Sequence, residues 1–298
     1  MVFVVQASKV AIRVRPEVVH ANDWNTMWAG MAIKLLCGAR LIYDSHELWA
    51  DRNGRWENRR WLTACEALFV RFADEVITSS PGHSQAIARR CHIPAPKVVR
   101  NIPSAPPSTS ERTSSPSGSQ VVYVGGLMPG RGLEQMIDVL ALLPEVQLRA
   151  IGPGSMTFRA ALEQRARTTG VADRLWICDP VPPDAITDAI ADAAVGLCLI
   201  QPVCRSYELC LPNKLFEYAI AGIPVLASDL PVIAETVRLA DIGEIVGPSD
   251  PSAIAAGLER LLKADSLACK ARNARRFAES QTWEKESLTL AMAYAEKE

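Results

Sequence analysis

The sequence predicts an α/β protein built from two domains, each with a parallel β-sheet. Short apolar runs alternate along most of the chain with longer segments of helical periodicity, which is the pattern of strand–helix–strand units. The apolar runs contain few polar positions, as expected for strands covered on both faces. A single stretch rich in proline and serine interrupts the alternation, and 298 residues suit two modest domains.

The composition excludes several classes of function. The chain is 49% hydrophobic and 22% charged, as in ordinary globular proteins. Its 32 basic and 33 acidic side chains nearly cancel, so we expect no nucleic acid partner. The eight cysteines form neither a C-x-x-C pair nor a zinc-ligand spacing, since Cys198, Cys204 and Cys210 lie six residues apart. We therefore expect buried thiols in a reducing compartment and no metal site.

Features of membrane proteins are weak in this sequence. No apolar run approaches the roughly 20 residues of a membrane span, and the first residues lack the features of a signal peptide, so we expect a cytoplasmic protein. Residues 52–72 are predicted to form one helix that mixes arginines with aromatic residues. Such a helix is either a solvated face with an apolar stripe, or a surface for peripheral contact with an anionic inner membrane face. The residues concerned are Trp49, Arg52, Arg55, Trp56, Arg59, Arg60, Trp61, Phe69 and Arg71.

The first hundred residues contain three predicted strands, at 17–21, 40–43 and 75–79. Asp23 is expected to cap a helix that ends at Gly38. The loop after the second strand contains His46, and open α/β sheets bind their ligands where strands end. His46 is therefore a candidate ligand-contacting residue. The alternative interpretation is a loop histidine bonded to a neighbouring Asp or Glu.

The stretch 103–119 reads PSAPPSTSERTSSPSGS and has almost nothing to bury, so it is predicted to be a linker. It divides the chain into a partial N-terminal domain at 1–102 and a second domain at 120–280. The remaining residues, 281–298, are predicted to form a C-terminal helix.

Two glycine-rich turns follow predicted strands at the start of the second domain. Gly125 and Gly126 follow the strand 120–124, and Arg131 stands at the end of that turn. Gly152 and Gly154 follow the strand 146–151. Glycine between a strand and a helix lets backbone amides approach a phosphate. An arginine can form bidentate hydrogen bonds with a diphosphate.

The stretch from Tyr207 to Pro231 carries the strongest signal. Pro212 suits a first helical position, and Gly222 is expected to end the helix in the left-handed conformation. Lys214 in the first turn would add a positive charge where an anion is favoured, and Glu217 follows on roughly the same face. A phosphate beside Lys214 and a diol on Glu217 would fit a nucleoside diphosphate. The alternative is a Lys–Glu pair on the surface of a helix that only packs.

The segment PNKLFEYAIAGIPVLAS resembles the donor-binding segment of the retaining GT-B glycosyltransferases of group 1, also called glycosyltransferase family 4. The resemblance implies a GT-B-like fold, with two Rossmann-like domains and a last helix that crosses back to the first. It implies that Glu217 holds the ribose hydroxyls. The family often has a second glutamate where this chain has Leu209, with Glu208 one step out of register.

The resemblance extends to both glycine turns. The first is similar to the family's G-R-x-x-x-x-K-G loop, in which Gly126 replaces the first basic residue and Arg131 stands for the second. The second resembles the family's loop near the nucleoside. By this resemblance, the catalytic residues are His46, Arg131 and Lys214, with His46 on the acceptor side. The donor-binding residues would be Gly125, Gly126, Arg131, Gly152, Gly154, Val181, Leu211, Pro212, Asn213, Lys214 and Glu217.

The implied function is transfer of a sugar, with retention, from a nucleoside diphosphate sugar to a glycan or a lipid-linked acceptor. No Asp-x-Asp motif is present, so we expect neither a metal nor another cofactor. The glycine-rich loop that opens the family's first domain does not precede residue 17, so the N-terminal domain is expected to be incomplete. This leaves open a partner chain that completes it, and a truncated homologue that binds nucleotide without catalysis. A further alternative is a sugar-nucleotide 2-epimerase, which shares the GT-B architecture.

Overall fold

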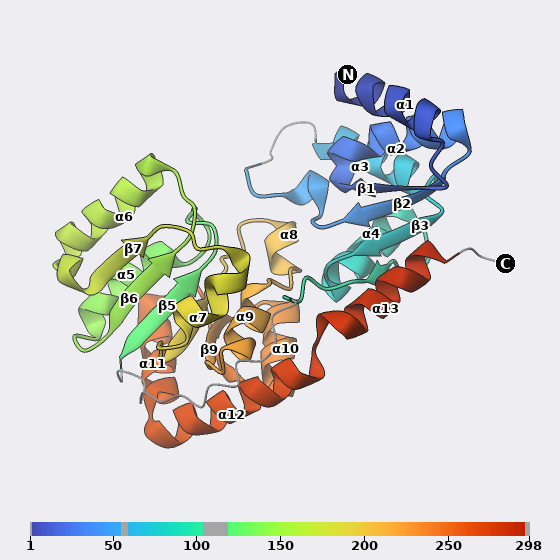
Figure 1. The fold of residues 1–298 in the computed structure, drawn as a ribbon. Helices are drawn as coiled ribbons and strands as arrows, with labels where there is room; N and C mark the ends of the chain where they lie inside the picture. Colours follow the sequence, from blue (N-terminus) through green and yellow to red (C-terminus); the bar gives the residue numbers. More distant parts are fainter. Residues whose placement is uncertain (1, 55–58, 104–118, 296–298) are drawn as a thin grey trace. The chain divides into compact units, whose positions relative to one another are not determined.

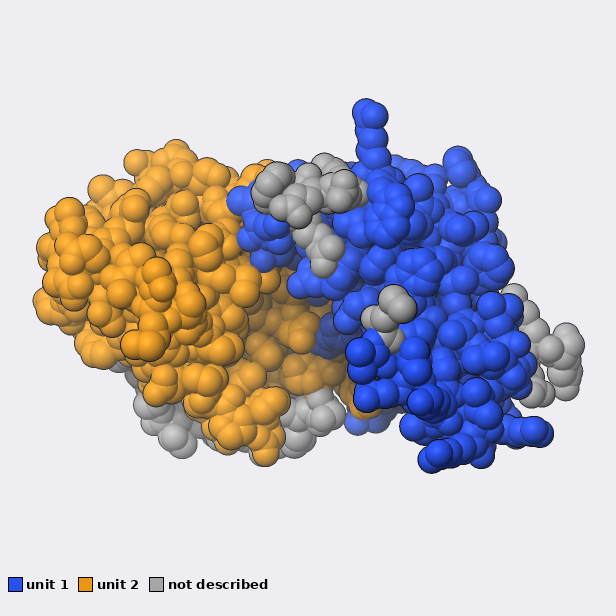
Figure 2. Space-filling view, turned by 90° about the horizontal axis from the view of Figure 1, so that it is seen from above, with its two compact units in different colours: residues 1–101, 203–211, 284–298 blue, residues 102–202, 212–283 orange. Residues whose placement is uncertain are grey.

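The computed structural model describes residues 2–54, 59–103 and 119–295, which form two compact units. Unit 1 comprises residues 1–101, 203–211 and 284–298, and unit 2 comprises residues 102–202 and 212–283 (Figure 2). Each unit contains its own parallel sheet with helices on the faces of that sheet (Figure 1). The predicted α/β class with two parallel sheets is confirmed.

Unit 1 contains a four-stranded sheet in the order β1-β2-β3-β4, and all its strand pairs are parallel. Its strands are β1 (Val18–Asn22), β2 (Arg40–Ser45), β3 (Glu75–Thr78) and β4 (Lys97–Val98). Its helices are α1 (Val2–Val14), α2 (Asp23–Cys37), the 3-10 turn η1 (Trp49–Asp51), α3 (Arg59–Val70), α4 (Pro81–Cys91), α8 (Arg205–Glu208) and α13 (Trp283–Tyr294).

Alternating side chains of β2 fill two separate cores. Leu41 and Tyr43 pack on one face of the sheet with Met27 of α2. Ile42 points to the other face and packs with Ala293 of α13. Because both faces are covered, the middle of the strand, residues 41–43, is a continuous apolar run without polar alternation.

Unit 2 contains a six-stranded parallel sheet in the order β10-β9-β8-β5-β6-β7. Its strands are β5 (Gln120–Val124), β6 (Gln147–Ile151), β7 (Leu175–Cys178), β8 (Val195–Cys198), β9 (Val225–Ser228) and β10 (Gly243–Val246). Its helices are α5 (Leu133–Leu142), α6 (Met156–Thr169), η2 (Ala172–Arg174), η3 (Pro183–Ala185), α7 (Ile186–Ile190), α9 (Lys214–Ile220), α10 (Pro231–Ala240), α11 (Pro251–Leu262) and α12 (Ala264–Ser280).

The strand order of unit 2 reverses direction at β5. From β5 the chain first continues outward to β6 and β7, and it then returns to β8 on the other side of β5. Open α/β sheets bind ligands at the carboxyl ends of the strands that flank such a reversal. The fold of unit 2 therefore points to the loops after β5 and β8 as a binding edge.

Several predicted helices differ from those observed. The single helix expected at 52–72 is wrong, because residues 52–54 are not helical and α3 spans only Arg59–Val70. Residues 55–58 lie outside the described residues. Helix α9 begins at Lys214 rather than at Pro212, whose carbonyl accepts a hydrogen bond from the Leu215 amide. Most of the expected linker, residues 104–118, also lies outside the described part of the chain.

Helix α1 was not expected from the sequence. Its apolar residues are mainly valine, which favours strands over helices, so local propensity argues against this helix. A strip of small side chains packs inward, where Ala7 and Ala11 lie against Ile33 and Ala39. Packing against α2 therefore explains the inward face of this helix.

Candidate functional site

In unit 2, the two glycine turns after β5 and β6 are hydrogen-bonded to each other. The Gly125 amide donates to the Ile151 carbonyl at 3.0 Å, and the Leu127 amide donates to the Pro153 carbonyl at 2.7 Å. Gly152 has a φ of +150°, and a Cβ atom there would lie 2.0 Å from the Gly125 carbonyl oxygen. A side chain at Gly152 is therefore excluded both by the backbone conformation and by the neighbouring turn.

Lys214 lies beside these turns although it belongs to a distant part of the sequence. Its side chain is buried, with 7% of the residue exposed, so the alternative of a surface Lys–Glu pair is wrong. The Nζ atom lies 3.6 Å from the centre of the Tyr123 ring. A Cβ atom at Gly125 would be 3.5 Å from Nζ, so the lysine charge lies directly against the first glycine turn.

Tyr123 is a residue of this site that sequence reasoning missed. Its ring lies under the Lys214 ammonium group, a contact that favours the charged lysine, and its hydroxyl donates to the Gly126 carbonyl at 2.7 Å. In the sequence, Tyr123 is one apolar-strand residue among several in QVVYV. Its position two residues before Gly125 was the only signal.

Arg131 brings a second positive charge to the same edge. It lies in the turn between β5 and α5 and is half-buried. Burial raises the pKa of the Cys198 thiol to about 11, against the opposing charges of Lys214 and Arg131. Cys198 ends β8, so both cations act at the carboxyl ends of β5 and β8, the two strands at the reversal of strand order.

Glu217 lies one turn along α9 from Lys214 and is half-buried. Burial raises the pKa of its carboxyl group, and the Lys214 charge opposes that rise. Gly222 ends this segment with a φ of +67°, so the expected left-handed conformation is confirmed.

The other predicted donor-binding residues fall into three places. Pro212 and Asn213 provide carbonyls that accept the first hydrogen bonds of α9. Val181 lies in the loop after β7. Leu211 is buried and ends the segment 203–211, which belongs to unit 1. Unit 2 thus brings together Gly125, Gly126, Arg131, Gly152, Gly154, Lys214 and Glu217, and their roles stay predictions.

A second cluster lies at the carboxyl ends of β1 and β2 in unit 1. His46 Nε2 lies 3.3 Å from Asp44 Oδ2, and His20 Nε2 lies 3.2 Å from the same oxygen. The other nitrogen of His20 is 2.6 Å from the Tyr294 hydroxyl on α13. His46 is therefore bonded to a neighbouring Asp, and sequence reasoning had named neither His20 nor Tyr294 as a partner.

Asp44 controls the charge in this cluster. The hydrogen bond with Asp44 raises the pKa of His46, although burial acts in the opposite direction. Burial would raise the pKa of Asp44, but its bonds to His20 and His46 outweigh burial and lower it. The cluster thus contains a stable carboxylate with an imidazole that binds its proton more tightly than usual.

Asp23 does not act as the predicted helix cap. It is the first residue of α2, and Asn22 at the cap position makes no side-chain capping bond. Instead, Asp23 Oδ1 accepts a hydrogen bond from the His46 amide at 3.1 Å. Asp23 therefore belongs to the same cluster as His46.

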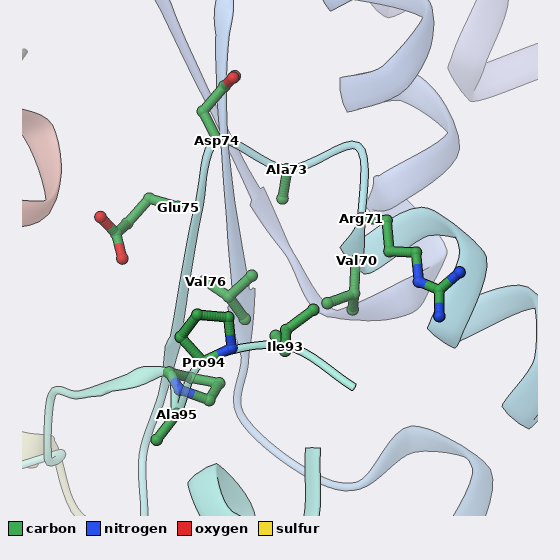
Figure 3. A pocket seen from close by; sticks show the side chains of 10 residues that line it. Val70, Arg71, Ala73, Asp74, Glu75, Val76, Ile93, Pro94 and Ala95 are labelled. Atoms are coloured by element: carbon green, nitrogen blue, oxygen red, sulfur yellow. The ribbon is translucent and has the colours of Figure 1, made fainter. Parts of the chain in front are cut away.

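A cavity of about 300 Å³ lies elsewhere in unit 1, at the amino end of β3 (Figure 3). Its lining consists of Val70, Arg71, Ala73, Asp74, Glu75, Val76, Ile93, Pro94, Ala95 and Pro96. Its two carboxylates already serve in ion pairs, Asp74 with Lys34 at 2.6 Å and Glu75 with Lys97 at 2.7 Å. None of the predicted site residues lines it.

The comparisons with known proteins identify the family. The profile described as "Glycosyl transferase 4-like domain" matches residues 3–102, and "Glycosyl transferases group 1" matches residues 118–264. The chain belongs to the group 1 GT-B glycosyltransferases. The sequence-based family assignment is therefore confirmed.

Curated relatives share about a quarter of their residues with this chain. It is 25% identical to a D-inositol 3-phosphate glycosyltransferase of Corynebacterium diphtheriae, over 84% of this chain and 64% of the relative. It is 26% identical to a glycogen synthase of Mycobacterium tuberculosis, over 95% of this chain and 68% of the relative. The chain thus spans about two thirds of the length of these relatives.

Solved structures confirm the GT-B fold. Sucrose-phosphate synthase from Thermosynechococcus elongatus superposes with a TM-score of 0.83 at 21% identity, covering 98% of this chain and 76% of that chain. Anabaena HepE in complex with UDP and glucose gives a TM-score of 0.80 at 17% identity, covering 98% of this chain and 80% of that chain.

Within the described residues, none of the helices has the length and apolarity needed to cross a membrane.

Proposed function

We propose that this glycosyltransferase takes a sugar from a nucleoside diphosphate donor bound to unit 2. The observation that carries the proposal is the convergence of Lys214 and Arg131 on the glycine turns at the carboxyl ends of β5 and β8. Two cations beside glycine-rich turns suit a diphosphate, which needs both charge and close backbone approach.

In the proposed reaction, the bond between the anomeric carbon and the diphosphate breaks, and negative charge accumulates on the departing diphosphate. Lys214 and Arg131 stabilise this charge, and a partly buried site makes their stabilisation stronger than it would be in water. The departing phosphate oxygen takes the proton of the acceptor hydroxyl as the new glycosidic bond forms on the same face. No dedicated base is then required, and the configuration at the anomeric carbon is retained.

Glu217 is proposed to hold the ribose. Its carboxylate can accept hydrogen bonds from two adjacent hydroxyl groups, and its position on α9 sets it one turn from the cation that binds phosphate. Uracil is the first base to test, because HepE was solved with UDP. The protein is expected to need no metal for this binding.

The test is calorimetric titration of the purified chain with UDP, GDP and ADP. Arg131→Ala and Glu217→Ala should each weaken binding of the preferred nucleotide at least about tenfold, since each removes a charged hydrogen-bonding group. Lys263→Ala is the matched control, because it removes an exposed cation from the same unit without touching the site. Equal affinity for the nucleotide in all variants would contradict the donor-site assignment.

The same preparation separates the remaining alternatives. Incubation of donor alone, followed by product analysis, would reveal an epimerised sugar nucleotide if the chain were a 2-epimerase. Binding of nucleotide without transfer to any acceptor would favour the non-catalytic homologue, or one that depends on a partner chain. Product stereochemistry would test retention.

We further propose that the acceptor is lipid-linked and that α1 lies on an anionic membrane. This helix contains Lys9 and Arg13 and no acidic residue. Most of its large apolar side chains are exposed, and so are three on the neighbouring α2. They are Val2, Phe3, Val5, Val10, Ile12, Val14, Trp28, Leu35 and Leu36. Exposed apolar groups together with positive charges favour contact with a surface of anionic lipids.

Flotation with vesicles tests this attachment. The chain should bind vesicles that contain phosphatidylglycerol and should not bind those of phosphatidylcholine alone. Phe3→Ser combined with Ile12→Ser should reduce binding severalfold. Loss of a dimer in these variants, with no vesicle binding by the parent, would instead indicate a second copy or a partner chain on this face.

A further inference from the structure

Strands β5 and β8, which lie side by side at the reversal of strand order in unit 2, part before they end. The last pair between them that the structure describes is Val122 with Gly196, although β5 continues to Val124 and β8 to Cys198. Each of the two strands pairs to its last residue with its other neighbour, β6 or β9. The parting is therefore particular to the junction of β5 and β8, at the edge where the diphosphate is proposed to bind.

The hydroxyl group of Tyr218, from α9, connects the two strands beyond this point. It accepts a hydrogen bond from the Val124 amide at 3.1 Å and donates to the Leu197 carbonyl at 3.1 Å. Tyr218 is fully buried, and burial raises the pKa of its hydroxyl group well above the ordinary value of 10.0. The hydroxyl group therefore keeps the proton that it donates, and it joins β5 to β8 where their backbone pairing has stopped.

Gly196 provides the room for the Tyr218 ring. A Cβ atom at Gly196 would lie 2.4 Å from Cγ of that ring, so a larger residue would displace the tyrosine. The φ of Gly196 is not in the left-handed region, so backbone conformation does not explain this glycine. Glycine within a strand often marks a close approach by another group. The sequence of β8 is therefore adapted to the inserted tyrosine.

Tyr218 and Lys214 lie one turn apart on α9, and both contact the end of β5. The Tyr218 hydroxyl binds the Val124 amide, and Lys214 Nζ lies 3.6 Å from the centre of the Tyr123 ring. Residues four positions apart share a face of a helix, so the tyrosine bridge sets where α9 lies on β5. Val124 directly precedes Gly125, and the same bond therefore anchors the start of the first glycine turn.

We propose that Tyr218 is a positioning residue of the donor site, which bridges the parted ends of β5 and β8 and thereby holds Lys214 where the diphosphate binds. Tyr218 acts through Lys214 and does not contact the ligand, because its hydroxyl group is enclosed between the two strands. This inference rests on the proposed function, since it needs a diphosphate beside Lys214. The loss of the bridge should therefore affect the diphosphate selectively and spare the nucleoside.

Tyr218→Phe tests the bridge, because it keeps the ring on Gly196 and removes only the hydroxyl group. The variant should bind UDP at least about fivefold more weakly, measured by calorimetry. Its affinity for uridine, which lacks the diphosphate, should change less than about twofold, measured by ligand-observed NMR. Calorimetry also gives the stoichiometry, so a fraction of unfolded chains is not mistaken for weaker affinity.

Tyr43→Phe is the matched control. It removes the hydroxyl group of another buried tyrosine, which donates to Glu66 at 3.2 Å in unit 1. This variant should bind UDP and uridine within about twofold of the parent protein. If it lost UDP affinity as Tyr218→Phe does, removal of any buried tyrosine hydroxyl would account for the result, and the inference would fail.

A double-mutant cycle decides whether Tyr218 acts through Lys214. In a Lys214→Met background, Tyr218→Phe should change the affinity for UDP less than about twofold, because the group that it positions is already absent. A purely structural role would leave the effect of Tyr218→Phe undiminished in that background. An undiminished effect would therefore contradict the inference.

Hydrogen exchange in the parent protein gives a test that does not depend on the folding of any variant. UDP should slow exchange of the Val124 amide severalfold, and uridine should not, because the diphosphate holds Lys214 and with it the bridge. An exchange rate of Val124 that is unchanged at saturation with UDP would overturn the inference.

The titrations also separate this inference from the proposed function. If the parent protein binds UDP and Tyr218→Phe binds it equally well, the positioning role is wrong and the donor site stands. An equal loss of UDP and uridine affinity would assign Tyr218 to the structure of the whole site and would refute a role through Lys214. Failure of the parent protein to bind UDP would remove the proposed function, on which the inference rests.

Discussion

The two units have the same kind of edge and opposite chemistry on it. In both, the candidate residues follow the carboxyl ends of neighbouring parallel strands. In unit 2 this edge presents the cations Lys214 and Arg131 over glycine turns. In unit 1 it presents the carboxylates Asp23 and Asp44 with imidazole groups. One edge is therefore cationic, and the other combines carboxylates with imidazole groups.

The two edges are also held together differently. The edge of unit 2 depends on backbone, because two turns approach so closely that a side chain at Gly152 cannot fit. The edge of unit 1 depends on a chain of side-chain contacts that runs from Asp44 through His20 to Tyr294. Close backbone approach therefore shapes the edge of unit 2, whereas hydrogen-bonded side chains shape the edge of unit 1.

Gly152→Ala should have the largest effect, on unit 2. The added methyl group would meet the Gly125 carbonyl oxygen at 2.0 Å, so the two turns must separate or the unit must unfold. We expect a loss of about 3 kcal/mol or more of unfolding free energy and loss of UDP binding. Denaturant unfolding and titration with UDP measure both. Gly247→Ala, where nothing lies within 4 Å, is the control and should be nearly neutral.

Glu66→Gln tests the buried charges of unit 1. Glu66 is 1% exposed, and burial raises the pKa of its carboxyl group from 4.5 to about 6, against the charge of Arg90. Because the folded pKa is the higher one, protonated Glu66 contributes stability that is complete below pH 4.5 and is lost as pH rises through about 6. The variant should lack this loss, which is worth about 2 kcal/mol.

Urea unfolding of Glu66→Gln and of the parent protein at pH 4.5 and pH 7 gives this difference directly. Glu17→Gln, which changes an exposed glutamate of the same unit, should show the parent's pH dependence. An identical pH dependence in Glu66→Gln would mean that Glu66 does not titrate in this window.

Asp44→Asn tests the series of hydrogen-bonded side chains in unit 1. The hydrogen bond to Asp44 raises the pKa of His46, so an amide in its place should let that pKa fall. In the parent protein, the stability that the His46–Asp44 pair adds is complete below the ordinary histidine pKa of 6.5. It is lost as pH rises through the raised pKa of His46, and this pH dependence of stability should disappear in the variant. NMR titration of the imidazole signals measures the pKa, and His46→Asn assigns the signal. An unmoved His46 pKa contradicts the role given to Asp44.

Tyr294→Phe should have the smallest effect. It removes a hydrogen bond of 2.6 Å to His20 at a residue that is 41% exposed, so the cost should be about 0.5–1 kcal/mol. Donor binding in unit 2 should not change. A large loss of UDP affinity would contradict this expectation, because it would show that the two edges depend on each other.

Sequence reasoning succeeded where the signal is local. The glycine turns, the strand pattern and the left-handed Gly222 all follow from neighbouring residues, and the structure confirms them. It failed where a partner is distant or where local propensity favours another structure. Tyr123 lies 91 positions before Lys214, so no spacing rule could pair them. Helix α1 is rich in valine, which favours strands over helices.

The parallel α/β class, the division into two domains and the family can all be predicted from the residues, because strand periodicity, turn glycines and the segment around Lys214 are short-range properties. The burial of Lys214 on Tyr123, and the bond of Asp23 to the His46 amide in place of a helix cap, are visible only in the folded chain. Burial and charge depend on which strands become neighbours, and a parallel sheet joins strands that are far apart in the chain.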